Sequence, residues 1–73
     1  MLRPSIALTQ GERAVVHSFN NEKIASKLMT MGMLPGSIIE FIRKAPFGGA
    51  IYIKVDGYNL ALRNNEASAI LVE

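Results

Sequence analysis

The sequence predicts a small, mainly β domain with one inserted α-helix, in which five short strands curl into a barrel. Two observations carry this prediction. A pattern with helical spacing ends at Gly32, and beyond it apolar residues alternate through short segments separated by Gly, Pro, Asp or Asn. Strands this short and numerous usually curl into a barrel, because closure leaves few unpaired edges. The 73 residues are expected to form a single domain, with residues 1–9 as an N-terminal arm.

The composition is that of a globular domain. It is 49% hydrophobic and 19% charged, which is more apolar than a disordered segment. The absence of cysteine excludes a disulfide framework and a thiolate metal site. No apolar run reaches the roughly 20 residues that a membrane span requires. We therefore expect a soluble, cytoplasmic protein that is not inserted in a membrane.

The first strand is expected over residues 13–19, after a turn at residues 10–12. Ala14 and Val16 share one face of this strand, while Val15 and His17 share the other.

A helix is expected to follow, from about Asn21 to Met31. The side chain of Asn21 suits the N-cap, because its oxygen can accept from a free N–H group of the first turn. Ile24, Leu28 and Met31 recur at helical spacing and form the expected core face.

The segment that follows ends the helix and begins the sheet. Gly32 is placed to stop the helix, since the residue just past a helix end often adopts the left-handed conformation. Pro35-Gly36 suits the centre of a type II turn.

Residues 37–44 predict the second strand, although their alternation is imperfect. Ile39 and Phe41 are expected to point inward, with Ile42 half-covered. A five-residue connection is expected over residues 45–49.

The clearest local pattern predicts a β-hairpin around Asp56-Gly57, a preferred pair for a two-residue type I′ turn. A register slip of one residue would expose the whole apolar face. The expected pairs on that face are Val55 with Tyr58, Ile53 with Leu60 and Ile51 with Leu62; on the other, Lys54 with Asn59 and Tyr52 with Ala61. A single helical turn over residues 63–67 and a last strand over residues 69–72 are expected to complete the chain.

The sequence contains no recognisable catalytic or metal-binding pattern. His17 is the only histidine, and no His-x-x-x-His, paired-Asp or calcium-loop spacing occurs. The serines lie in no nucleophile-elbow motif, and no phosphate-binding glycine loop is present. We therefore expect a protein that is not an enzyme and that has no cofactor and no dedicated metal site. The alternative is a transition metal bound weakly by His17 and a neighbouring carboxylate.

Three of the four methionines lie within five residues of one another. Met31 is expected to occupy the inward direction, which leaves its neighbours for an exposed apolar patch. Contiguous exposed apolar residues often mark an interaction site, and methionine adapts well to partner surfaces. The alternative is that the barrel covers these residues. The expected partner-binding patch comprises Met29, Met33, Leu34, Pro35 and Phe47.

Three blocks of the sequence, in this order and with these separations, resemble the FeoA family. They are Met31–Gly36, Arg43–Gly48, and Leu60–Arg63 with Glu66-Ala67. The resemblance covers roughly Leu8 to Glu73. One departure is Gly49-Ala50, where many relatives have Asp-Pro, and it concerns the tip of a loop.

The resemblance implies an SH3-like small barrel with an inserted helix. It also implies a role in ferrous iron uptake, as a small cytosolic partner of FeoB, a membrane transporter with an N-terminal G-protein domain. The resulting hypothesis is a non-catalytic accessory protein that binds the cytosolic part of the transporter and modulates its activity. The apolar patch would also suit self-association.

The alternative hypothesis is a small basic barrel that binds nucleic acid. The net charge of +2 supports it weakly, because the basic residues are spread along the chain. Single-strand binders interleave basic residues with exposed aromatic rings, and only Tyr52, near Lys54, fits that description.

Overall fold

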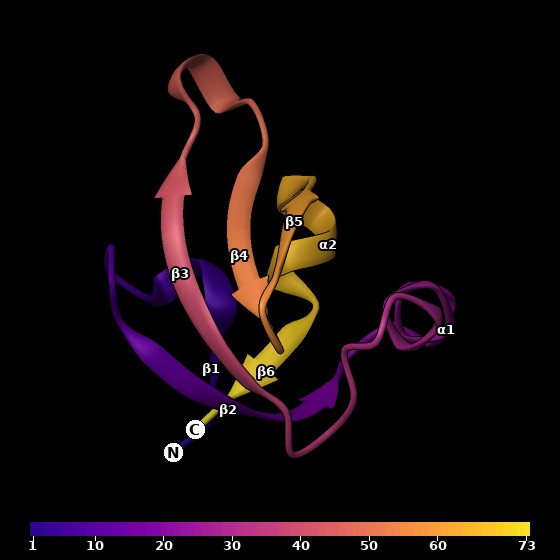
Figure 1. Ribbon diagram of the computed structural model, residues 1–73. Helices are drawn as coiled ribbons and strands as arrows, with labels where there is room; N and C mark the ends of the chain where they lie inside the picture. The colour runs from indigo at the N-terminus through magenta and orange to yellow at the C-terminus, as the bar shows by residue number, and fades with distance from the viewer.

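A computed structural model describes all 73 residues and confirms the mainly β class with an inserted helix (Figure 1). It has six strands rather than five, two α-helices and two short 3₁₀ helices. In chain order the elements are β1 (Arg3–Pro4), η1 (Ser5–Ala7), β2 (Arg13–Phe19), α1 (Glu22–Thr30), β3 (Ile38–Lys44), η2 (Pro46–Gly48), β4 (Ile51–Val55), β5 (Tyr58–Leu62), α2 (Asn64–Ser68) and β6 (Ile70–Val72).

The strands form one antiparallel sheet in the order β1-β6-β2-β3-β4-β5. The sheet curls like a small barrel, as Figure 1 shows, but it does not close, because β1 and β5 do not pair with each other. Each of these two strands therefore has one free edge. Helix α1 stands to one side of the curled sheet.

The additional strand comes from the segment that was expected to be an N-terminal arm. Strand β1 pairs with β6, and Arg3 lies opposite Val72. Ser5 is buried, and its Oγ donates a hydrogen bond to the carbonyl of Ala67 at 2.5 Å. The first residues are thus part of the sheet, and the two chain ends lie side by side in Figure 1.

The hairpin of β4 and β5 has all five predicted residue pairs. Asp56 and Gly57 both have positive φ, at 48° and 83°, as a type I′ turn requires. On the apolar face the β4 residues are buried, whereas Tyr58, beside the turn, is exposed.

Strands β2 and β3 also follow the predicted faces. Ile39 and Phe41 are buried and Ile42 is half-buried. A bulge after Phe41 then shifts the register and places Arg43 opposite Tyr52, with the guanidinium 4.8 Å from the ring centroid.

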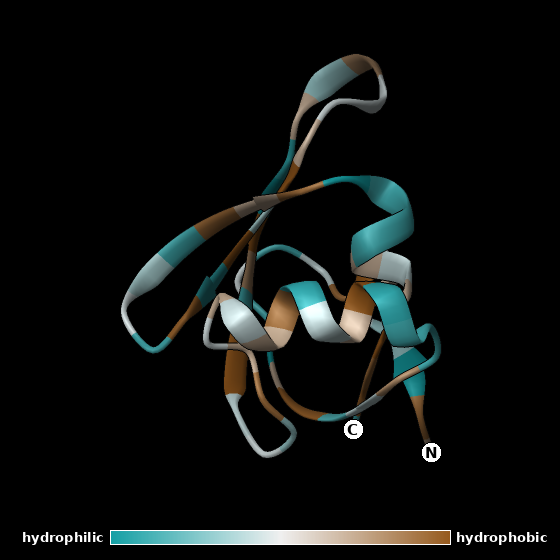
Figure 2. Cartoon of the chain, turned by 90° about the vertical axis from the view of Figure 1, so that its right-hand side faces the viewer, coloured by the Kyte–Doolittle hydropathy of each residue, from teal (hydrophilic) through white to brown (hydrophobic).

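The core is one cluster of 14 buried apolar residues drawn from the sheet, α1, α2 and two connecting segments. Helix α1 contributes one fully buried side chain, Leu28, to the cluster. Ile24 and Met31 are partly buried and pack against the cluster. Figure 2 shows α1 with apolar and polar segments alternating along it, as expected for a helix that packs on one face. The helix is capped by Asn21, whose Oδ1 accepts from the N–H of Ile24 at 3.0 Å.

Candidate interaction surface

The end of α1 determines which of the neighbouring methionine and leucine side chains face the solvent. Gly32 has a φ of +92°, as predicted, and its N–H donates to the carbonyl of Met29 at 3.0 Å. The N–H of Met33 donates to the carbonyl of Leu28, also at 3.0 Å. These two bonds, with the left-handed glycine between helix and turn, define a Schellman motif.

The prediction that Met33 is exposed was wrong, because the Schellman motif turns this side chain inward. Met33 is fully buried in the core cluster, together with Leu28. A contact between the residues at these two positions commonly accompanies the motif. Met31, which was expected to fill the core direction, is half-buried at the helix cap.

The next residues form a tightly held turn. Ser37 N–H donates to the carbonyl of Leu34 at 2.9 Å, and Gly36 has a φ of +94°, which confirms the predicted type II turn. The Oγ of Ser37 also accepts from the N–H of Leu34 at 3.1 Å. Backbone bonds from Gly36 to Val16 and from Val16 to Ser37, at 2.7 and 2.8 Å, fix the turn against β2.

This turn presents apolar side chains to the solvent beside the exposed side of α1. Leu34 is 50% exposed and Met29 is 42% exposed, and Pro35 is exposed as well. Met29 and Pro35 line the same open hollow, together with Phe19 and Ala25. We call Met29, Leu34 and Pro35 the turn surface.

Phe47 does not belong to the turn surface, so the predicted patch was too large. It lies in η2, beyond the far end of β3 (Figure 1). Since β3 has seven residues, the two ends of the strand are about 20 Å apart. Phe47 is fully exposed at the tip of the connection and has a φ of 60°.

Two exposed apolar residues near the turn surface were missed. Ile38 begins β3 directly after the turn and is 59% exposed, and its partner across the strand pair is Val15, which is also exposed. The alternation that puts Ile39 inward also puts Ile38 outward, so the sequence did contain this information.

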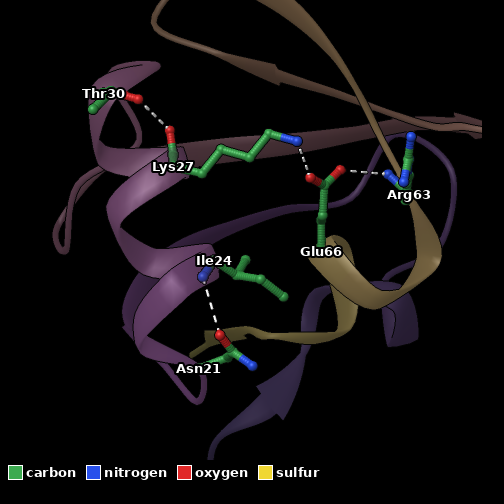
Figure 3. A network of polar contacts seen from close by, with 6 residues as sticks. All are labelled: Asn21, Ile24, Lys27, Thr30, Arg63 and Glu66. Atoms are coloured by element: carbon green, nitrogen blue, oxygen red, sulfur yellow. Dashed lines mark hydrogen bonds and ion pairs between the residues drawn. The ribbon is translucent and has the colours of Figure 1, made fainter.

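A polar network holds α1 in its position. Lys27 in α1 forms an ion pair with Glu66 in α2, and the same carboxylate accepts from the backbone N–H of Arg63 at 2.9 Å (Figure 3). Glu66 is buried, and the N–H of Arg63, followed by the ammonium of Lys27, lowers the pKa of its carboxyl below the ordinary 4.5. The pair ties the helix that carries Met29 to α2.

No group of three or more His, Cys, Asp or Glu side chains is arranged to hold an ion. His17 is exposed, and its Nδ1 lies 2.9 Å from the Oγ of Ser18.

The aromatic ring required by the nucleic-acid alternative is only partly accessible. Tyr52 is half-buried, and Arg43 covers one face of its ring at 4.8 Å. A base would have to displace this guanidinium to stack there.

None of the helices has the length and apolar character needed to cross a bilayer.

Comparison with known proteins matches almost the whole chain to one protein family. The model of the FeoA domain matches residues 7–73. A solution structure of an FeoA-like protein from Clostridium acetobutylicum is 33% identical, with a TM-score of 0.88, and the match covers 99% of this chain and 85% of that one.

Two crystal structures show the same similarity. An iron uptake regulatory protein, FeoA, is 26% identical with a TM-score of 0.86, covering all of this chain and 96% of that one. FeoA of Stenotrophomonas maltophilia, crystallised with zinc and described as an SH3 domain protein suggested to activate ferrous iron transport, is 29% identical with a TM-score of 0.80; the match covers 96% of this chain and 88% of that one.

Proposed function

Because the chain belongs to the FeoA domain family, we propose that it is a non-catalytic accessory protein of bacterial ferrous iron uptake. In this proposal it acts in the cytoplasm, binds the cytosolic part of a FeoB-type transporter through the turn surface, and modulates the transporter's activity. The family and its solved members connect the chain with iron transport.

The observation that supports this contact is the exposure of apolar side chains on a rigid turn. Leu34 is half exposed although the backbone on both sides of it is fixed by hydrogen bonds. A partner that covers it gains apolar burial without having to order a loop, and ordering a loop is a major cost of association. Full burial of a leucine is worth about 1.5–3 kcal/mol, so covering the exposed half contributes about 1 kcal/mol.

The test is Leu34→Asp, measured by calorimetric titration against the cytosolic domain of the transporter and by ferrous iron uptake in cells. The variant loses the apolar contact and places a carboxylate in an interface that must desolvate it, so a loss of at least about 2 kcal/mol, or roughly thirty-fold in affinity, is expected. Phe47→Asp is the matched control, since it makes the same kind of change at the opposite end of β3 and is expected to bind normally.

Both variants replace exposed residues, so thermal unfolding should show that each remains folded. If folded Leu34→Asp binds the domain and supports uptake like the parent protein, the turn surface is not the contact. If Phe47→Asp loses affinity instead, the contact lies at the β3–β4 connection.

A further inference from the structure

The free edge of strand β5 differs from the free edge at the other end of the sheet. Exposed edges are usually protected from pairing with other chains by short length, proline, charge or bulges. Strand β1 has three of these features, since its two residues are Arg3 and Pro4. Strand β5 has none: its five residues, Tyr58–Leu62, include no charge and no proline, and they pair with β4 without a register shift.

The backbone groups on this edge are available. A type I′ turn is closed by a hydrogen bond between its flanking residues, Val55 and Tyr58, and inward and outward groups then alternate along the strand. Asn59 and Ala61 therefore direct their N–H and C=O groups away from β4. Both residues are exposed, and neither appears among the backbone bonds made outside helices and strands. In Figure 1, β5 is the last strand of the β3-β4-β5 succession.

The surroundings of the edge carry positive charge. Lys54 lies opposite Asn59, and Arg43 packs over Tyr52, which lies opposite Ala61. Lys54, Tyr52 and Arg43 share the face on which β5 has only the short side chains of Asn59 and Ala61, so β5 does not cover the charges of Lys54 and Arg43.

Two carboxylates lie in the same region, Glu40 opposite Lys54 and Asp56 in the turn before β5, and they offset part of this charge. Glu40 forms its ion pair with Arg13, at 3.2 Å, so the three basic residues Arg13, Arg43 and Lys54 outnumber the two carboxylates. At the other end, the edge leads into a hollow lined by Gly48–Ala50 and by Ala61–Asn65, which includes the exposed Arg63.

From these observations we propose that β5 is a docking strand for an extended, acidic segment of a partner protein, which adds as a seventh strand to the sheet. Its backbone pairs with Asn59 and Ala61, and its acidic side chains lie on the face of Lys54 and Arg43. Apolar side chains in alternate positions cover Tyr58 and Leu60 on the other face. A second copy of this chain fits less well, because it would bring the same basic residues together.

This proposal is independent of the turn surface and of the transporter. The probe is a capped seven-residue peptide of alternating valine and glutamate, titrated into isotopically labelled protein at low salt. We expect shifts and slowed hydrogen exchange at the amides of Asn59 and Ala61. The same peptide with lysine in place of glutamate is expected to bind at least ten-fold more weakly.

The decisive variant is Ala61→Pro. The N–H of Ala61 faces away from β4, so proline at this position leaves the hairpin bonds in place. It removes an outward donor and blocks an added strand. It should abolish peptide binding, whereas Ala61→Ser should not. Ala61→Glu keeps every backbone group and reverses the local charge, so it should also prevent binding even if the proline variant fails to fold.

Three results would overturn the proposal. One is equal binding of the glutamate and lysine peptides, and another is normal binding by folded Ala61→Pro and Ala61→Glu. The third is a dimer that dissociates on Ala61→Pro substitution, which would assign the edge to a second copy of the chain. Leu34→Asp should leave peptide binding unchanged, so failure here is distinguishable from failure of the proposed transporter contact.

Discussion

Met33→Ala is expected to destabilise the protein strongly, although Met33 lies in a connection between a helix and a strand. Its side chain is fully buried and is a member of the core cluster with Leu28. Truncating a buried methionine to alanine costs about 2–5 kcal/mol, because apolar contacts are lost and a cavity remains. The alanine variant should therefore lose at least about 2 kcal/mol.

That loss is large for a chain of 73 residues. At about 0.05–0.15 kcal/mol per residue, the whole domain has a free energy of unfolding of about 4–11 kcal/mol. One kcal/mol shifts the melting temperature of a domain of this size by about 4–8 °C, so a decrease of more than about 8 °C is expected.

Urea unfolding followed by circular dichroism measures the change, and two variants control it. Met29→Ala alters an exposed methionine and favours the helix slightly, so it should change the free energy of unfolding by less than about 1 kcal/mol. Met33→Leu conserves volume and should cost less than about 1.5 kcal/mol. Equal, small losses for Met33→Ala and Met29→Ala would refute the assignment of Met33 to the core.

Two further variants test the structure around the turn surface. Gly32→Ala should lower the free energy of unfolding by about 1–2 kcal/mol, because Gly32 has a left-handed φ that alanine adopts only with strain. The added Cβ would meet no other atom, so no steric clash adds to this cost. Gly32→Asn should lose less, and an unchanged urea midpoint for the alanine variant would argue against the Schellman motif. Glu66 has a pKa below 4.5, so its stabilising bonds are complete above that pH and are lost as the pH falls through the lower pKa of the folded state. Melting temperatures measured from about pH 7 down to about pH 3 should therefore decrease more steeply for the parent protein than for Glu66→Gln, and parallel curves would contradict this role.

The sequence predicts best where local chemistry determines the geometry. The hairpin register follows from Asp56-Gly57 and from the two-residue period of its side chains, and all five pairs are confirmed. Strand β2 has the predicted bounds, and α1 lacks only one residue of the expected helix at each end. The stop at Gly32 is equally local.

The elements that sequence analysis missed depend on distant partners. Strand β1 has only two residues and therefore no periodicity, and it is a strand because β6 lies beside it. The bulge after Phe41 arises from the pairing with β4 and is not visible in β3 alone. The separation of Phe47 from the turn surface likewise depends on the full length of β3.

The error at Met33 has a specific cause that also bears on function. Helical spacing predicts that Met31 points inward and Met33 outward, but the Schellman motif reverses the chain at Gly32 and exchanges these directions. With Met33 anchored in the core, the following residue, Leu34, is held outward by its bonds to Ser37. The buried methionine thus limits the motion of the exposed leucine, and a partner that covers Leu34 meets a surface already fixed in the free protein.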